Sequence, residues 1–251
     1  MKIKKILFYL FIVISIFLIY KATFNKSINY IALGDSVAEG VNPYGEKTYG
    51  YTDYIADYLD TNGILGTYIK DFAKSNYAIE DLYDDINNNK SIKTEDNYIN
   101  LKSSLRESDL VTISIGLNDL KKGITISNIK NKLIDKNKVK NRINEVMNEL
   151  DKLIKLIIKY GKGDIIVVGY YNPLPYLNTY KEDIDEIIDY TNKKYKEVCD
   201  NNKIYFVEVS KYLSGRTDYL PNPFDIHPNT MGYNEIFKQV KKVIDNKYLN
   251  N

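Results

Sequence analysis

Apolar residues along the chain gather in five short runs that are rich in β-branched side chains. Polar residues bound each run, and this pattern is typical of strands buried in a sheet. The runs are Tyr30–Leu33, Thr67–Phe72, Leu110–Ile115, Asp164–Tyr170 and Lys203–Val209.

Longer stretches between these runs have apolar residues at helical spacing. They are Thr52–Leu59, Ile79–Ile86, Ile126–Tyr160, Ile184–Val198 and Tyr233–Ile244. Strands that alternate with helices predict right-handed crossovers and a parallel sheet covered on both faces. We therefore expect an α/β fold, a three-layer α/β/α sandwich. The polar stretch Asn87–Asn100 is expected to lie on the surface.

The N-terminal stretch Met1–Lys26 has the pattern of a targeting segment. Three lysines within the first five residues precede the apolar run Ile6–Tyr20, which only a serine interrupts. This run matches a signal sequence and is short for a membrane span. Because no small-x-small cleavage pattern lies near Tyr20–Phe24, the sequence favours an uncleaved signal anchor over a removed signal peptide or a core helix. We expect residues 27–251 to form one extracytoplasmic domain, attached to the cell membrane or secreted if cleavage occurs.

Composition narrows the chemistry. The chain has 251 residues and a net charge near +2, without a dense basic patch or a glycine-rich phosphate loop, so a nucleic-acid partner is not expected. The single cysteine, Cys199, lies in a helical stretch and is interpreted as a core residue. HExxH, CxxC and paired histidines are absent from the sequence, so we expect no metal and no cofactor.

Polar groups follow the predicted strands at the edge where ligands bind in such sheets. Gly34-Asp35-Ser36, Ala73-Lys74-Ser75-Asn76, Gly116-Leu117-Asn118-Asp119 and Tyr170-Tyr171-Asn172-Pro173 follow the first four strands, and Asp225-Ile226-His227-Pro228 precedes the last helix. Each motif alone is common in turns and helix caps. Together they contain what acyl transfer requires.

A nucleophile, a base and a residue that orients the base can be assigned. Ser36 lies at a strand-to-helix turn, where its hydroxyl can be exposed. His227 is the only histidine, so it is the only imidazole base available. Asp225 lies two residues earlier and can bind the other ring nitrogen.

Donors for a developing oxyanion can also be assigned. The Asn118 side-chain amide is one candidate, and the backbone N–H groups of Ser36 and of a residue after the second strand are others. We interpret Asp35 and Asp119 as structural residues. Tyr170, Tyr171 and Leu117 are candidates for an acyl pocket. These three assignments are a hypothesis based on the positions of the residues at the ends of the predicted strands.

Three of these segments resemble the SGNH/GDSL hydrolases. The segment 31–36 is similar to the first block of that family, Gly116-Leu117-Asn118-Asp119 to the G-x-N-D block, and Asp225-Ile226-His227-Pro228 to the D-x-x-H-P block, over about residues 29–247. The resemblance implies a flavodoxin-like sheet of order 2-1-3-4-5. It also implies hydrolysis of esters or thioesters through an acyl-enzyme, without metal or cofactor, with Gly116 and Asp35 in supporting positions. Tyr171-Asn172-Pro173 resembles a segment of secreted or anchored bacterial lipase-like members.

The second family block departs from the usual pattern. It normally contains a glycine whose N–H points into the oxyanion hole, and the alignment places Asn76 there, with Ala73 as the alternative. Asparagine tolerates the left-handed backbone conformation better than most residues, so the donor can be retained.

Three functions are compatible with these observations. The first is an esterase or lipase-like hydrolase of small-molecule, lipid or glycan esters. The second is an O-acetyl esterase that acts on cell-wall material or polysaccharide. The third, from a different class, is a catalytically weak binding domain tethered to the membrane. The sequence does not indicate the oligomeric state.

Overall fold

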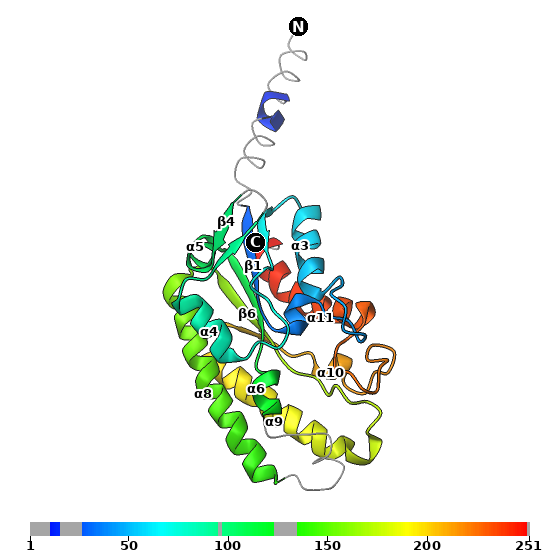
Figure 1. Ribbon diagram of the computed structural model, residues 1–251. Coiled ribbons are helices and arrows are strands. Elements are labelled where there is room, and N and C mark those ends of the chain that lie inside the picture. The colour runs from blue at the N-terminus through cyan, green and yellow to red at the C-terminus, as the bar shows by residue number, and fades with distance from the viewer. Residues whose placement is uncertain (1–10, 16–26, 95–96, 123–134, 250–251) are drawn as a thin grey trace.

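The computed structural model describes residues 11–15, 27–94, 97–122 and 135–249, and its centre is a parallel five-stranded sheet (Figure 1). The spatial order of the strands is β2-β1-β5-β6-β7, which is 2-1-3-4-5 when the strands of this sheet are counted along the chain. The flavodoxin-like order is therefore confirmed. The strands are β1 (Ile28–Gly34), β2 (Leu65–Ile69), β5 (Leu110–Ser114), β6 (Asp164–Val168) and β7 (Tyr205–Val207).

Helices cover both faces of the sheet, which confirms the three-layer sandwich. Successive side chains of β1 alternate between two cores, with Ile31 and Leu33 in one and Tyr30 and Ala32 in the other. On the first face lie α4 (Ile79–Asn87), α5 (Leu101–Glu107), α8 (Lys136–Tyr160) and α9 (Lys181–Asn201); on the second lie α3 (Tyr51–Thr61) and α11 (Thr230–Ile244).

The two edge strands differ most from their predicted ranges. β2 ends at Ile69, and the buried Phe72 lies in the turn beyond it. β7 covers only Tyr205–Val207. An edge strand pairs on one side only, so its apolar run can continue past the last ladder bond and still be buried. The predicted helix 126–160 is α8 from Lys136 onward, and residues 126–134 lie outside the described residues.

The polar stretch 87–100 contains an antiparallel pair, β3 (Ser91–Lys93) and β4 (Tyr98–Asn100). Helix α5 was not predicted, because seven residues hold too few turns for a clear period. The short elements α2 (Ser36–Glu39), α6 (Leu117–Lys121), η1 (Asn178–Tyr180), α10 (Ser210–Leu213) and η2 (Asp245–Leu249) complete the described structure.

Of the predicted targeting segment, only residues 11–15 are described, so the prediction for residues 1–26 lies largely outside the described structure. None of the helices in the described ranges is both long enough and apolar enough to span a bilayer. Residue 27 precedes β1 at the end of the sheet opposite Gly34, so the preceding segment joins the domain far from the carboxyl ends of the strands (Figure 1).

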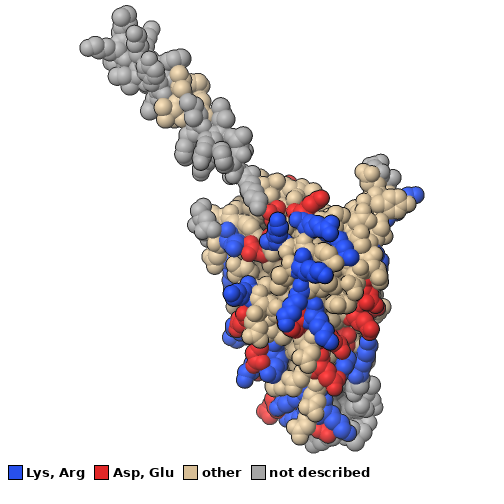
Figure 2. Space-filling view, turned by 90° about the vertical axis from the view of Figure 1, so that its left-hand side faces the viewer, with Lys and Arg blue, Asp and Glu red and all other residues tan. Residues whose placement is uncertain are grey.

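A group of cations surrounds Tyr160 at the end of α8. Lys102, Lys159 and Arg106 lie 4.8, 5.4 and 5.9 Å from the ring centroid. Figure 2 shows this side of the molecule, where Lys and Arg are intermixed with Asp and Glu. Helix α8 ends at the edge of the sheet where β6 begins, so this group of cations lies at the opposite edge from the carboxyl ends of the strands.

Candidate active site

The turn after β1 places Ser36 at the start of helix α2. Gly34 has φ of +136°, and a Cβ there would lie 2.0 Å from the carbonyl oxygen of Ser114. Glycine is therefore required where β1 packs against β5. The Asp35 N–H donates to that carbonyl at 2.9 Å. The turn leaves the Ser36 side chain half-buried at the carboxyl edge of the sheet.

Asp35 caps helix α2. Its Oδ1 accepts the Val37 N–H at 3.0 Å, while the residue is only 3% exposed. Burial raises the pKa of Asp35 to about 7, although the hydrogen bond from Val37 opposes this shift. Its carboxyl group shapes the turn from within the core.

His227 and Asp225 lie against Ser36, although 191 residues separate the histidine from the serine. His227 Nε2 lies 2.7 Å from Ser36 Oγ, and Nδ1 lies 2.6 Å from Asp225 Oδ1. The same carboxylate oxygen accepts the His227 N–H at 2.8 Å. With the proton on Nδ1, Nε2 can accept the serine hydroxyl hydrogen.

Side chains fix the loop that contains these two residues. Asn222 donates through Nδ2 to the Pro43 carbonyl at 2.6 Å, and the Tyr171 hydroxyl donates to the Ile226 carbonyl at 2.9 Å. At the end of the loop, Asn229 caps α11 by accepting the Gly232 N–H at 3.0 Å. The loop is thus attached to three separate parts of the fold.

Asn118 lies at the next strand end and faces the loop after β2. Its Nδ2 donates to the Tyr77 carbonyl at 2.9 Å, which uses one of its two amide hydrogens. Gly116, with φ of +112°, leaves no room for a Cβ because the Tyr195 hydroxyl would lie 2.3 Å away. Asp119 is buried and accepts the Ile79 N–H at 3.0 Å, so it ties α6 to the start of α4.

Asn76 has φ of +66°, the left-handed conformation that a glycine would adopt at this point. Among the described residues, neither the Asn76 N–H nor the Ser36 N–H has a protein acceptor. The neighbouring N–H groups all have acceptors: Ala73 donates to Lys70 O at 2.9 Å, Lys74 to Gly34 O at 3.0 Å, Ser75 to Glu39 Oε2 at 2.8 Å and Tyr77 to Lys74 O at 3.2 Å. Asn76 therefore fits the donor position better than Ala73.

Glu39 is a buried carboxylate that the sequence did not indicate. It lies in α2, accepts both the N–H and the hydroxyl of Ser75, and forms an ion pair with Lys47. Burial opposes its ionisation, but hydrogen bonds from Lys47 and Ser75 outweigh burial and lower its pKa. Glu39 thus joins the Ser36 helix to the Asn76 loop, and no sequence motif marks this contact.

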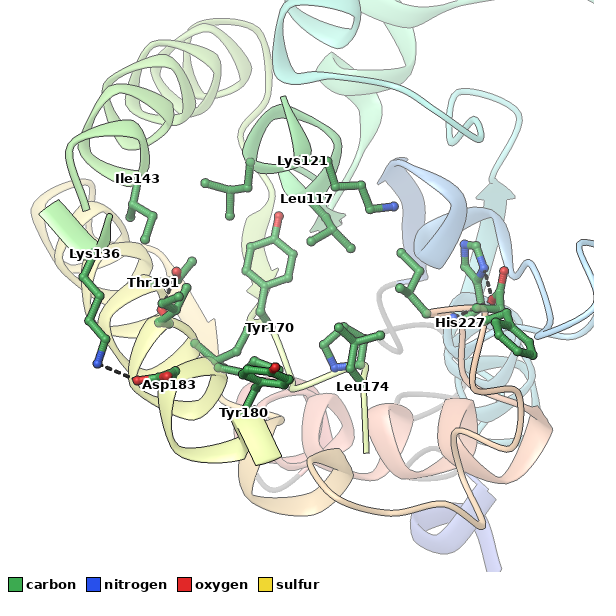
Figure 3. Close-up of a pocket in the computed structure, with 18 residues that line it drawn as sticks. Leu117, Lys121, Lys136, Ile143, Tyr170, Leu174, Tyr180, Asp183, Thr191 and His227 are labelled. Carbon is green, nitrogen blue, oxygen red and sulfur yellow. Dashed lines mark hydrogen bonds and ion pairs between the residues drawn. The ribbon is translucent and has the colours of Figure 1, made fainter. Parts of the chain in front are cut away.

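A cavity of about 630 Å³ opens beside His227 (Figure 3). Of the predicted pocket residues, Leu117 and Tyr170 line it. Tyr171 is not among its described lining residues; it is buried, with its hydroxyl on the Ile226 carbonyl. Lys121 also lines the cavity, and its charge interacts with Asp35 and Asp225.

Other nucleophile and metal sites are not evident in the described part of the chain. Burial raises the pKa of Cys199 to about 12, so its thiol stays protonated at neutral pH. Within the described ranges, His, Cys, Asp and Glu side chains do not form a group of three that could hold a metal ion.

A comparison with models of protein families assigns this chain to one family. The GDSL-like lipase/acylhydrolase family model matches residues 32–234, and the chain belongs to that family. No curated protein matches the chain.

Solved structures share the fold at low sequence identity. The acetylxylan esterase Axe2 from Geobacillus stearothermophilus is 17% identical, with a TM-score of 0.58 over 87% of this chain and 94% of that one. The lipase Lip_vut3 from a goat rumen metagenome is 19% identical, with a TM-score of 0.64 over 86% and 97%. TesA is 14% identical, with a TM-score of 0.60 over 86% and 98%.

Proposed function

We propose that this protein is a serine hydrolase that cleaves carboxylic esters through an acyl-enzyme intermediate. The observation that supports it most is the pair of short contacts made by one imidazole, 2.7 Å to Ser36 Oγ and 2.6 Å to Asp225 Oδ1. A hydroxyl, a base and a carboxylate in that order form the arrangement that activates serine for acyl transfer.

The reaction follows from these contacts. His227 Nε2 takes the hydroxyl proton as Ser36 Oγ attacks the ester carbonyl carbon. Asp225 stabilises the imidazolium through Nδ1. Collapse of the tetrahedral intermediate breaks the bond to the alcohol oxygen, which receives the proton from His227. A water molecule then attacks the acyl-enzyme by the same steps, releasing the carboxylic acid and restoring Ser36.

The oxyanion would be bound by the Ser36 N–H, the Asn76 N–H and the second amide hydrogen of Asn118. Removal of Asn118 Nδ2 in Asn118→Ala should lower kcat by roughly 10²–10³-fold, because one oxyanion donor is lost. The Asn76 donor is tested by a pair of variants. Asn76→Gly keeps the left-handed backbone and should keep activity, whereas the β-branched Asn76→Val should lose about ten-fold.

The decisive experiment measures hydrolysis of p-nitrophenyl esters by the full chain, with Ser36→Ala as the matched variant. We expect turnover by the wild type and a loss of roughly 10⁴–10⁶-fold in Ser36→Ala. A fluorophosphonate probe should label the wild type at Ser36 only. Equal turnover by Ser36→Ala, or absence of both turnover and labelling, would reject the proposal.

Two alternatives give different results in the same assays. The similarity to an acetylxylan esterase favours an O-acetyl esterase as the second candidate. That enzyme would release acetate from acetylated glycans and would act poorly on longer acyl esters. A catalytically weak binding domain would leave the probe unreacted, because labelling requires an activated hydroxyl.

We also propose that residues 1–26 attach the domain to the cell membrane, with the domain outside the cytoplasm. Since that segment joins the fold at the opposite end of β1 from Ser36, the site would face away from the bilayer. Cell fractionation and N-terminal sequencing test this. A mature protein that begins near residue 27 in the medium would indicate cleavage and secretion instead.

A further inference from the structure

The cavity beside His227 is far larger than an acetyl group requires. Its volume of about 630 Å³ equals the space of roughly 20 water molecules at about 30 Å³ each. It also lies within the range of cavities that hold drug-sized ligands. A site that handled only acetyl esters would need no space of this size next to its base.

The walls of the cavity are apolar along most of their length. They are formed by side chains from α6, α8, α9 and the loop after β6, chiefly Leu117, Ile143, Tyr170, Leu174, Ile187 and Ile188. Polar groups lie at its two ends. His227 is at one end and the Lys136–Asp183 ion pair, with an N–O distance of 2.7 Å, is at the other (Figure 3).

The shape of the cavity follows from the lengths of the helices. Helix α8 has 25 residues, or roughly 37 Å, and α9 has 21, or roughly 31 Å, whereas a five-residue strand such as β6 spans roughly 17 Å. The N-terminal turns of both helices therefore extend past the carboxyl ends of the strands (Figure 1), and Ile143 and Ile187 on these two helices line the cavity. Beyond the strands, the apolar faces of these two helices have no sheet to pack against and enclose the cavity instead.

We propose that this cavity binds the acyl chain of the ester, with the carbonyl at Ser36 and the methyl end directed toward Ile143. An acyl chain of medium length suits a cavity of this class, which holds drug-sized ligands. This inference rests on the proposed ester hydrolysis and specifies its substrate class as medium-chain acyl esters.

The position of Ile187 makes it a test of chain length. It lies on α9 between Asp183 and Thr191, one turn from each, so it belongs to the end of the cavity away from His227. A larger side chain there would fill the space needed by long chains before it reached the reacting carbonyl. The residue is half-buried, so a larger side chain can be accommodated without opening the core.

The test compares kcat/KM for p-nitrophenyl acetate, butyrate, octanoate and dodecanoate, using the full chain. We expect wild-type kcat/KM to rise about three- to four-fold per added methylene until the chain fills the cavity. Ile187→Trp should lower the octanoate-to-acetate ratio at least ten-fold, and Ile187→Ala should move the optimum to longer chains. Ile158→Trp on α8, where the residue is 41% exposed and outside the cavity, should leave the ratio unchanged.

Several outcomes would overturn the inference while the esterase proposal stood. One is a wild-type profile that is flat or falls with acyl length. Another is an equal loss on all esters in Ile187→Trp. A third is a kcat/KM that rises with the length of the alkyl group in a series of alkyl acetates but not with the length of the acyl chain. That result would place the alcohol in the cavity. Absence of all ester hydrolysis and of probe labelling would instead reject the esterase proposal itself.

Discussion

The turn of Ser36 and the loop of His227 meet at one hydrogen bond but are built differently. Main-chain contacts to neighbouring elements hold the first, with the Asp35 N–H on the Ser114 carbonyl at 2.9 Å and the Lys74 N–H on the Gly34 carbonyl at 3.0 Å, beside the Asp35 carboxyl that caps α2. Side chains hold the second, mainly those of Asn222 and Tyr171.

This difference predicts different responses to mutation. A buried main-chain turn has one conformation, so changes there should reduce the stability of the whole domain. A loop fixed by side chains can shift slightly when one contact is lost, so changes there should reduce activity more than stability. Variants in the turn and in the loop test this contrast.

Asp225→Asn in the loop should lower kcat by about 10⁴-fold, because an amide no longer fixes the tautomer with the proton on Nδ1. The free energy of unfolding should change by less than about 1 kcal/mol, since the side chain is 27% exposed. Kinetics and urea unfolding measure both effects. The control is Asp218→Asn, an exposed partner of Arg216 nearby. A decrease in the free energy of unfolding as large as the increase in the activation free energy would contradict the contrast between turn and loop.

Gly34→Ala in the turn should lower the free energy of unfolding by roughly 3–5 kcal/mol, because the new Cβ meets the Ser114 carbonyl oxygen. Gly45→Ala is the matched control. Gly45 also has positive φ, at +81°, but no atom lies within 4 Å of an added Cβ, so the cost should be about 1 kcal/mol. Equal melting temperatures for the two variants would show that the turn can move.

Asp35 should make stability depend on pH. Its pKa is about 7 in the folded state, against about 4 in the unfolded chain, because burial disfavours the charge. The folded state therefore binds the proton more tightly. Protonated Asp35 contributes roughly 4 kcal/mol at most to the free energy of unfolding. This contribution is complete below pH 4 and is lost as the pH rises through 7.

The variant Asp35→Asn should flatten this slope between pH 4 and 7 in urea unfolding. Asp119, whose pKa burial also raises, would leave a smaller slope of the same sign. The exposed Asp60→Asn serves as the control and should follow the wild type. A slope that persists in full after Asp35→Asn would assign the pH dependence to other groups.

Tyr171→Phe should have the smallest effect. It removes the hydrogen bond to the Ile226 carbonyl, which should cost less than about 1 kcal/mol of stability and about ten-fold in kcat, because His227 loses a support. Tyr190→Phe, which removes an exposed bond to Asn144, should change neither quantity measurably. A loss in kcat above a hundred-fold would mean that this loop cannot adjust.

Much of the site could be predicted because its parts are local. Each of Ser36, Asn118 and His227 lies next to a recognisable boundary between a strand or loop and a helix, and the carboxyl edge of a parallel sheet gathers such boundaries. The sequence also indicated that Asn76 could replace a glycine, since the left-handed conformation is a property of single residues.

Contacts between distant side chains were not predicted. Glu39 meets Lys47 and Ser75 only because α2 packs beside the loop after β2. Tyr171 was assigned to the pocket from its place after a strand, whereas its hydroxyl binds the loop of His227. Neither contact is indicated by a periodic pattern or by the spacing of a motif in the sequence.

The succession of strands and helices along the chain, and the positions of Ser36, Asn118 and His227 next to element boundaries, therefore follow from the sequence, through the period of apolar residues and local backbone preference. The meeting of Ser36 with His227 and the cavity between α8 and α9 were decided only by the tertiary structure. Distances between side chains far apart in the chain, and the space that they enclose, depend on how whole helices pack.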